Sequence, residues 1–371
     1  MAPALAKLVA KALPLAARGL LTGYTTTALI PFYEDTTGSG VDWSTNVHVT
    51  VRMGSTTGHS YRPIVDTGTQ GMVFSAPEMD YDFNTPCEDQ GTPGWQFLSS
   101  SNLLYEGCWV PRDFYFNVGD PVNPVVKASV PILAMMYKSE CPTFDIASTT
   151  GHCPNASVPR IANATGTRMM GVGWGRQYDG LPQGTPDKNP LRNIVSIGTQ
   201  SMDPATAYSA GYVLDSHGLR VGLTDANTAG ISWYALEAHA SIAGEFREAR
   251  ACIAVDGATP CVPGHAVVDT GIGQSYLRMP AGTALRFVSG HSGRLVDTSA
   301  VRVDFGAPGS TAVATESFTL GSPGSPNVNP DYVSAVFRDP ALTYINTGRH
   351  AYRAFVTAFD GQNGRYGFRS V

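Results

Sequence analysis

The sequence predicts a mostly β fold in which two lobes face each other across a cleft. Three observations predict this fold: alternating apolar strands follow residue 24, the 371 residues include 40 Gly and 26 Pro, and one short motif occurs twice. Gly and Pro in this abundance indicate many turns, and only 15% of the residues are charged, which leaves little material for long charged helices. The length allows two or three domains or one large bilobal unit.

The repeated motif is Asp-Thr-Gly at the end of an apolar strand, first at residues 66–68 and again at residues 269–271. Glycine lets the backbone turn sharply, with its N–H aimed at the carboxylate. Two carboxylates about 3 Å apart cannot both ionise, so one acts as a base while the other stays an acid. Asp66 and Asp269 are therefore the candidate catalytic residues. The alternative is that both only cap turns and carry no chemistry.

The remaining elements follow from alternation and from turn residues. Strands are predicted at residues 47–53, 62–65, 112–118, 211–214, 219–223, 301–305 and 311–320. Helices are expected to be few and short, with the best candidates at residues 232–240, 281–289 and 332–337. Loops rich in Pro, Gly, Thr, Ser and Asn are predicted at residues 141–166, 176–190 and 321–330.

We expect three parts of the chain: an N-terminal targeting or leader segment at residues 1–24, an N-terminal β-lobe at 25–230 and a C-terminal β-lobe at 231–371. The first segment is rich in Ala and Leu, and three basic residues divide it into short apolar runs. It fits a poor signal peptide, an amphipathic targeting helix or a plain N-terminal helix. No run of about 18 apolar residues occurs, so no transmembrane span is expected.

Six cysteines form three pairs that are close in sequence, which suggests three short-loop disulfides: Cys87–Cys108, Cys141–Cys153 and Cys252–Cys261. Spacing alone does not fix the connectivity, and six buried free thiols are the alternative. Neither a C-x2-C motif nor a His pair at ligand spacing occurs, so no metal is expected. Two glycosylation sequons, at Asn155 and Asn163, support a secretory route. We therefore expect a secreted glycoprotein.

The charge pattern argues against nucleic acid as a partner. The net charge is −5, the isoelectric point is near 5.9, and no run of Lys and Arg interleaves with aromatic residues. The motifs of zinc peptidases, serine hydrolases and phosphate-binding loops do not occur either. We expect a monomer that needs no cofactor.

The order of several landmarks resembles the pepsin-like aspartic peptidases over about residues 45–369. The landmarks are the entry hairpin at 47–65, the apolar-apolar-Gly segment at 169–173, the strand pair at 212–223, the loop from Cys252 to Cys261, and the terminal hairpin at 355–369. The resemblance implies that Asp66 and Asp269 polarise one water for attack on a carbonyl. It also implies that Thr67, Gly68, Thr69, Thr270 and Gly271 support the two carboxyls.

The family also has a hairpin flap with a tyrosine, and the best match is Tyr105 in residues 104–108; the alternative is an ordinary strand aromatic. Several positions depart from the family pattern. Thr69 supplies the hydroxyl expected after the first motif, but Ile272 supplies none after the second, so we expect the ionised form of Asp269 to lose a stabilising bond. Val73 replaces the tryptophan that usually partners the flap tyrosine. Polar side chains also fall near the second motif, at Asn346 and Thr347.

Three functions remain in competition. The first is an aspartic endopeptidase with an acidic optimum that cleaves extended peptides between apolar side chains. The second is a non-proteolytic enzyme that uses the same carboxyls on a small apolar metabolite, which Ile272 and the polar Asn346 and Thr347 favour. The third is a non-catalytic binding module, against which the retention of both aspartates argues.

Overall fold

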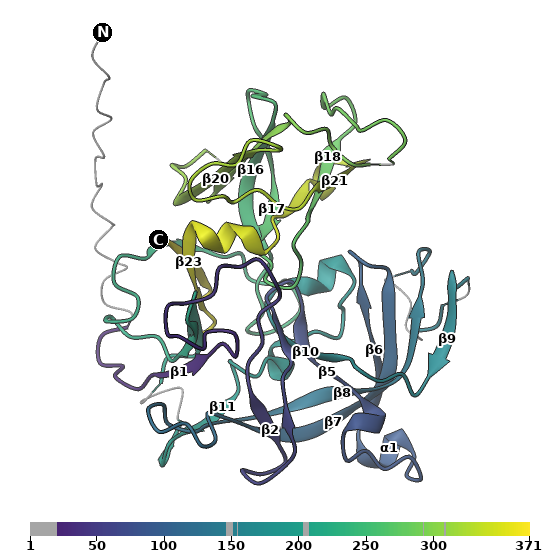
Figure 1. The fold of residues 1–371 in the computed structure, drawn as a ribbon, viewed down its shortest axis with the longest axis vertical. Helices are drawn as coiled ribbons and strands as arrows, with labels where there is room; N and C mark the ends of the chain where they lie inside the picture. Colours follow the sequence, from purple (N-terminus) through teal and green to yellow (C-terminus); the bar gives the residue numbers. More distant parts are fainter. Residues whose placement is uncertain (1–20, 146–150, 154, 203–207, 292, 308) are drawn as a thin grey trace.

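The computed structural model describes residues 21–145, 151–153, 155–202, 208–291, 293–307 and 309–371, and it confirms a mostly β, bilobal fold. Figure 1 shows the strands of the second lobe gathered above those of the first, with β23 reaching down between them. Most of the expected leader, residues 1–20, lies outside the described residues.

The first lobe is built on an eleven-stranded sheet. Its main path is β3 (Ser60–Tyr61), β2 (Val51–Met53), β7 (Leu103–Phe116), β8 (Val126–Glu140), β5 (Gln70–Ser75), β10 (Arg168–Val172) and β4 (Ile64–Asp66). The strands off this path are β6 (Thr92–Leu98), β9 (Val158–Ala162), β11 (Ile194–Ile197) and β12 (Gln200–Ser201). The sheet therefore ends on the strand that leads into the first Asp-Thr-Gly.

The second lobe is built on a seven-stranded sheet. Its order is β20 (Ala314–Thr319), β19 (Ala300–Phe305), β16 (Ala249–Val255), β17 (Val262–Val267), β22 (Tyr344–Asn346), β18 (Ser275–Pro280) and β21 (Val333–Arg338). Strand β17 leads into the second Asp-Thr-Gly, so both motifs leave a sheet strand.

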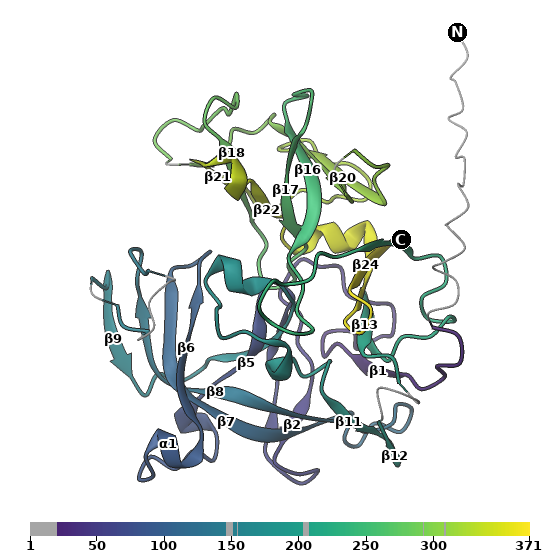
Figure 2. The same cartoon turned by 180° about the vertical axis from the view of Figure 1, so that it is seen from behind.

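A six-stranded sheet, which we call the joining sheet, connects distant parts of the chain. Its order is β1 (Ala28–Pro31), β14 (Gly218–Val221), β13 (Gly211–Asp215), β23 (Phe355–Asp360), β24 (Arg365–Ser370) and β15 (Ser232–Ala235). Residues 211–214 pair antiparallel with residues 357–360 at its centre. Figure 2 shows this sheet from behind, with β13 and β24 beneath the second lobe.

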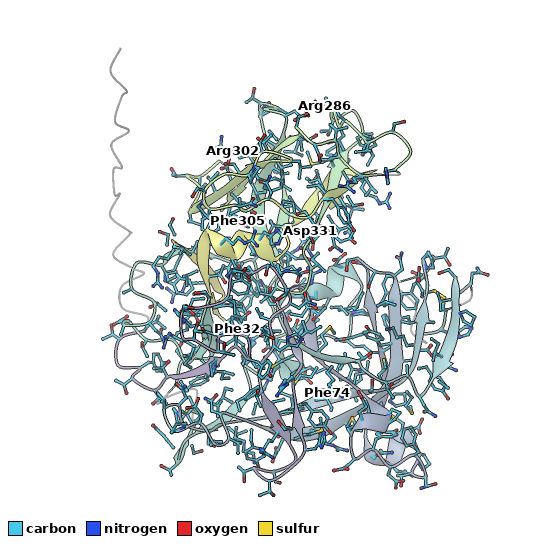
Figure 3. All side chains as sticks on the ribbon, viewed as in Figure 1. Phe32, Phe74, Arg286, Arg302, Phe305 and Asp331 are labelled. Atoms are coloured by element: carbon cyan, nitrogen blue, oxygen red, sulfur yellow. A yellow bond between two sulfur atoms is a disulfide. The ribbon has the colours of Figure 1, made fainter. Side chains whose placement is uncertain are left out.

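The strands form because their side chains alternate between core and solvent. In β19, Val301, Val303 and Phe305 are buried, while Arg302 points outward. Phe305 packs at the base of the second lobe against Phe368 of the joining sheet, with ring centroids 4.6 Å apart. Figure 3 shows Phe305 there, and Phe32 and Phe74 inside the first lobe. One apolar core thus continues from the first lobe through the joining sheet into the second.

Helices are short, as expected, but the predicted positions are wrong. Residues 232–235 form β15 and residues 333–338 form β21, while 281–289 form turns and irregular structure with one isolated bridge. Strands β15 and β21 pair with β24 and β18, which are far from them in the sequence. Local propensity does not reveal such pairing. The described helices are α1 (Cys87–Gln90), η2 (Ala76–Glu78), η3 (Arg176–Asp179), η4 (Pro186–Lys188), η5 (Pro340–Leu342) and η6 (Arg349–Arg353).

The three disulfides pair as predicted: Cys87–Cys108, Cys141–Cys153 and Cys252–Cys261. The free-thiol alternative is therefore wrong. Three disulfides fit a protein of the extracellular space or the secretory pathway. Both sequon residues, Asn155 and Asn163, are exposed. Within the described part of the chain, every helix is too short or too polar to cross a membrane.

Candidate active site

The two Asp-Thr-Gly turns meet in the middle of the molecule, and each lobe builds its turn in the same way. In the first lobe, β10 lies parallel to β4, with Met169 opposite Ile64 and Gly171 opposite Asp66. In the second lobe, β22 lies parallel to β17, with Asn346 opposite Val267. A strand before the aspartate, a strand after it and a third strand parallel to the first thus hold each turn. The sequence repeat is a repeat of structure.

A crossed pair of threonines locks the turns together. The Thr67 hydroxyl donates to the carbonyl oxygen of Val268 at 2.7 Å and accepts from the backbone N–H of Thr270 at 3.0 Å. The Thr270 hydroxyl donates to the carbonyl oxygen of Val65 at 2.6 Å and accepts from the N–H of Thr67 at 3.1 Å. Both side chains are buried, so all four bonds are shielded from water. The predicted supporting residues Thr67 and Thr270 therefore hold the lobes in register.

Glycine is required in both turns because each carboxyl lies against the opposite turn. A Cβ atom at Gly68 would stand 2.1 Å from a carboxylate oxygen of Asp269, and one at Gly271 would stand 2.7 Å from Cγ of Asp66. Each glycine N–H also donates to the aspartate of its own turn at 2.7 Å. No larger residue allows this approach without displacing a carboxyl.

The two carboxyls share a buried environment that favours a single proton. Burial raises the pKa of Asp66 well above its usual value, and the charge of Asp269 and a hydrogen bond shared with it raise the pKa further. The N–H of Gly68 and the nearby Thr69 hydroxyl act in the opposite direction. The Thr69 hydroxyl makes no well-formed hydrogen bond among the described residues, so its effect is one of proximity. The balance of these effects leaves the pKa of Asp66 raised.

Asn346 corrects the expectation that Asp269 lacks a second donor. Its side-chain amide donates to Oδ2 of Asp269 at 2.6 Å, while the N–H of Gly271 serves Oδ1. Ile272 only lines the cavity in front of the carboxyls. The sequence places a polar residue near the second motif, but the contact of Asn346 with Asp269 depends on the pairing of β22 with β17.

Arg176 is a supporting residue that the sequence did not reveal. Its side chain is buried, and Nε donates to the carbonyl oxygen of Gly68 at 2.7 Å. Its Nη2 donates to Asp179 at 2.5 Å, and the other carboxylate oxygen of Asp179 accepts from Arg278 at 2.6 Å. Burial alone would raise the pKa of Asp179, but the two guanidinium groups outweigh burial and hold the pKa below its usual value. This cluster fixes the first turn through the carbonyl oxygen of Gly68.

The Tyr105 side chain lies beside the carboxyls, on a long hairpin formed by β6 and β7. Burial raises its pKa to about 12, and the negative charge of Asp66 adds to this rise. Val73 and Trp109 pack with Tyr105 in one apolar cluster. Val73 stands where the pepsin-like peptidases have a tryptophan, and Trp109 lies in the same cluster four residues after Tyr105 along β7.

The tip of this hairpin reaches the second lobe. The hydroxyl of Tyr276 on β18 donates to the carbonyl oxygen of Ser100 at 2.6 Å. Beneath the tip lies a cavity of about 370 Å³ that contains Asp66, Asp269 and Tyr105. Its apolar lining consists of Ile64, Phe97, Leu98, Met169, Leu181 and Ile272. The hairpin therefore covers the carboxyls and is tied down across the cleft.

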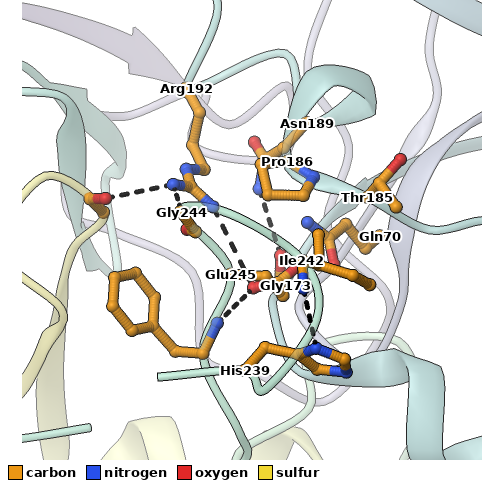
Figure 4. A network of polar contacts seen from close by, with 12 residues as sticks. Gln70, Gly173, Thr185, Pro186, Asn189, Arg192, His239, Ile242, Gly244 and Glu245 are labelled. Carbon is orange, nitrogen blue, oxygen red and sulfur yellow. Dashed lines mark hydrogen bonds and ion pairs between the residues drawn. The ribbon is translucent and has the colours of Figure 1, made fainter. Parts of the chain in front are cut away.

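A second polar network anchors the segment that enters the second lobe. Glu245 is buried, accepts from Gln177 at 3.1 Å and lies 4.0 Å from Arg192. Arg192 also donates to the carbonyl oxygens of Gly244 at 2.7 Å and Gly361 at 3.0 Å. Figure 4 shows Arg192 and Glu245 at the centre of these contacts. The network ties residues 244–245 to both the first lobe and the joining sheet.

Among the described residues, no group of three His, Cys, Asp or Glu side chains is arranged to hold a metal ion. In comparisons with known proteins, no family model matches the chain, and no curated protein is similar enough to count as a match.

Proposed function

We propose that this chain is an aspartic endopeptidase that hydrolyses peptide bonds with Asp66 and Asp269. The observation that carries the proposal is the meeting of two Asp-Thr-Gly turns, in which each glycine lies against the carboxyl of the other turn. Such a pair holds one proton between two carboxyls and thereby provides an acid and a base together. The resemblance to pepsin-like peptidases points to the same chemistry.

The geometry supports distinct roles for the two carboxyls. Asp269, which accepts bonds from Gly271 and Asn346, is the base that takes a proton from water as the water oxygen bonds to the scissile carbonyl carbon. Asp66 is the acid that gives its proton to the carbonyl oxygen. Collapse of the resulting diol then breaks the C–N bond, and the amine leaves with a proton returned by the pair.

The cavity supports an extended substrate with apolar side chains next to the scissile bond. Phe97 and Leu98 line the cavity from the hairpin, and Ile272 lines it from the second lobe. Tyr105 above the carboxyls fits the role of a flap tyrosine that excludes water when substrate is bound.

The test is cleavage of a denatured protein between about pH 3 and pH 5, where one carboxyl of such a pair is protonated. Asp66→Asn and Asp269→Asn are each expected to abolish cleavage, and a statine-containing peptide is expected to inhibit the unmodified protein. A folded protein that cleaves nothing over this range would refute the peptidase proposal.

One observation favours the second candidate, an enzyme that acts on a small apolar metabolite. The bond from Tyr276 to Ser100 ties the hairpin to the second lobe over a cavity of about 370 Å³, and pockets of about 300 to 1,000 Å³ are typical of small-molecule sites. This candidate requires that the Asp→Asn variants lose product formation from a small substrate although the unmodified protein shows no proteolysis. The shared hydrogen bond between the carboxyls supports either enzyme over a binding module.

A further inference from the structure

A second pocket, of about 240 Å³, opens next to the cavity of the two aspartates. The two spaces share Ser99, Ser100, Asp179 and Asn346 in their linings. Asn346, which binds Asp269, lines both spaces, so the second pocket lies directly beside the carboxyls. We call this space the arginine pocket because of the side chains described next.

More basic than acidic side chains line the arginine pocket. Arg278 of β18 and Arg338 of β21 are both present, and Asp179 is the one acidic residue in the described lining. Arg338 is exposed and donates a hydrogen bond to the carbonyl oxygen of Phe337 at 3.1 Å, and it makes no ion pair among the described residues. It therefore brings a positive charge that no carboxylate neutralises.

Arg278 is held in place while part of it stays open to solvent. Its guanidinium binds Asp179 at 2.6 Å and lies 5.0 Å from the ring centroid of Tyr344, yet 31% of its side chain is exposed. An arginine with a fixed guanidinium loses little conformational entropy when it binds a carboxylate. The pocket thus offers Arg278 as a preorganised donor and the exposed Arg338 as a second donor.

The acidic partner of Arg278 is already shared. Asp179 also binds the buried Arg176 at 2.5 Å, so one carboxylate serves two guanidinium groups. Glu248 lies 3.9 Å from Arg176, but burial raises the pKa of Glu248 although the charge of Arg176 opposes the rise. Under acidic conditions Glu248 therefore tends to be neutral. The cluster of Arg176, Asp179, Arg278 and Glu248 keeps an excess positive charge where an acid enzyme would work.

We propose that the arginine pocket binds an acidic side chain, Asp or Glu, of the substrate peptide, and that Arg278 and Arg338 determine this preference. The proposal rests on the proposed function, because it assumes a peptide in the neighbouring cavity. An acidic residue at one position of the substrate then faces two guanidinium groups, whereas glutamine or a basic residue there does not gain this attraction.

The test uses apolar statine-containing peptides in which a single Glu or Gln is moved through every position on both sides of the statine. Dissociation constants are measured at pH 5, where glutamate is largely ionised. At one position we expect Glu to bind roughly fivefold to tenfold more tightly than Gln, as befits a partly exposed ion pair of about 1 kcal/mol. The same pairs built with a normal peptide bond should show the ratio in kcat/KM.

Arg338→Gln is the informative variant, because it removes a positive charge that pairs with no carboxylate among the described residues; it should reduce the preference to about twofold or less. Arg278→Lys keeps the charge that Asp179 needs and tests the planar guanidinium. The matched control is Arg302→Gln on β19, which removes an exposed charge far from the arginine pocket and should keep the full preference.

The outcomes separate the two proposals. Tight binding of the neutral peptides without any position that prefers Glu would overturn the arginine pocket and leave the peptidase proposal standing. A preference that survives in both Arg338→Gln and Arg278→Lys would also overturn it. If no statine peptide binds and none of the normal peptides is cleaved, the peptidase proposal fails and the inference falls with it.

Discussion

Asn346 donates a hydrogen bond of 2.6 Å to the carboxylate oxygen of Asp269 that the N–H of Gly271 leaves free. Met169 holds the corresponding position beside Asp66, because each of these two residues pairs with the residue two places before its aspartate. An amide donor therefore faces one carboxyl, and a thioether lies at the equivalent place near the other. For the proposed peptidase, this difference supports Asp269 as the base.

Replacement of Asn346 by leucine removes its hydrogen bond to Asp269 and should destabilise the ionised form of that carboxyl. A hydrogen bond to a charged group contributes roughly 1.5 to 3 kcal/mol. We expect the acidic limb of the kcat/KM profile to move up by about one pH unit or more. Peptide hydrolysis measured in half-unit steps of pH checks the shift. Adding Ile272→Thr, which restores a hydroxyl beside the same carboxyl, should move the limb back; a profile that stays in place in both variants would contradict the role of Asn346.

Replacement of Tyr276 by phenylalanine should release the tip of the hairpin, because the variant retains the ring but loses the bond to Ser100. The expected loss is about 1 kcal/mol, which corresponds to a fivefold rise in local opening. Hydrogen exchange of the amides at residues 98–103 measures this opening. Tyr33→Phe, which alters an exposed tyrosine elsewhere in the first lobe, is the control, and equal exchange in both variants would show that Tyr276 does not restrain the tip.

The crossed threonines should couple in a double-mutant cycle. Thr67→Val and Thr270→Val each leave buried backbone groups without their partners, so each is expected to lower the free energy of unfolding by roughly 1 to 3 kcal/mol. The double variant should lose less than the sum of the two, because both hydroxyls belong to one network. Urea denaturation supplies the energies. Thr→Ser at either position retains the hydroxyl and should recover most of the loss; strict additivity would mean that the turns are not linked in this way.

Glu316 should make the second lobe more stable in acid than at neutral pH. It lies buried on β20, neither carboxyl oxygen has a hydrogen-bond partner among the described residues, and burial raises its pKa to about 8. Since this pKa exceeds the ordinary value of 4.5, the folded state binds the proton more tightly than the unfolded chain. The resulting stability is complete below the ordinary pKa and is lost as pH rises towards 8, by up to roughly 4 kcal/mol.

Denaturation at several values between pH 4 and pH 8, a range that spans both pKa values of Glu316, measures this slope. Glu316→Gln cannot ionise and should flatten it. The exposed Glu237, changed to Gln, is the matched control. An unchanged slope in Glu316→Gln would place the pH dependence on other groups.

The sequence was sufficient for the elements whose signals are local. Alternation located β13, β14 and β19 close to their observed bounds, and the spacing of the cysteines gave the correct pairs. It failed at residues 232–240 and 332–337, where apolar and aromatic residues suit a short helix as well as a strand. Pairing with β24 and β18 decides these two cases, and neither partner is a neighbour in sequence.

The same limit applies to the candidate site. A repeated motif was enough to select Asp66 and Asp269, which the structure brings together. Arg176 lay in a stretch predicted as a loop, and its role depends on reaching back to Gly68. The contact of Asn346 likewise depends on a parallel strand pair that forms across more than 75 residues. Side chains that act through tertiary contacts leave no periodic signal.

The joining sheet has a consequence for the order in which a ribosome makes the protein. Strand β13 ends at Asp215, but its neighbour β23 begins at Phe355. Likewise, 203 residues separate Thr67 from its partner Thr270 in the sequence. A nascent chain that has been made only as far as β13 lacks the strand β23 that pairs with it. Its first Asp-Thr-Gly turn also lacks the second turn that contacts it. The two carboxyls therefore cannot meet until translation has passed both motifs, so the site is absent from the emerging polypeptide before that point.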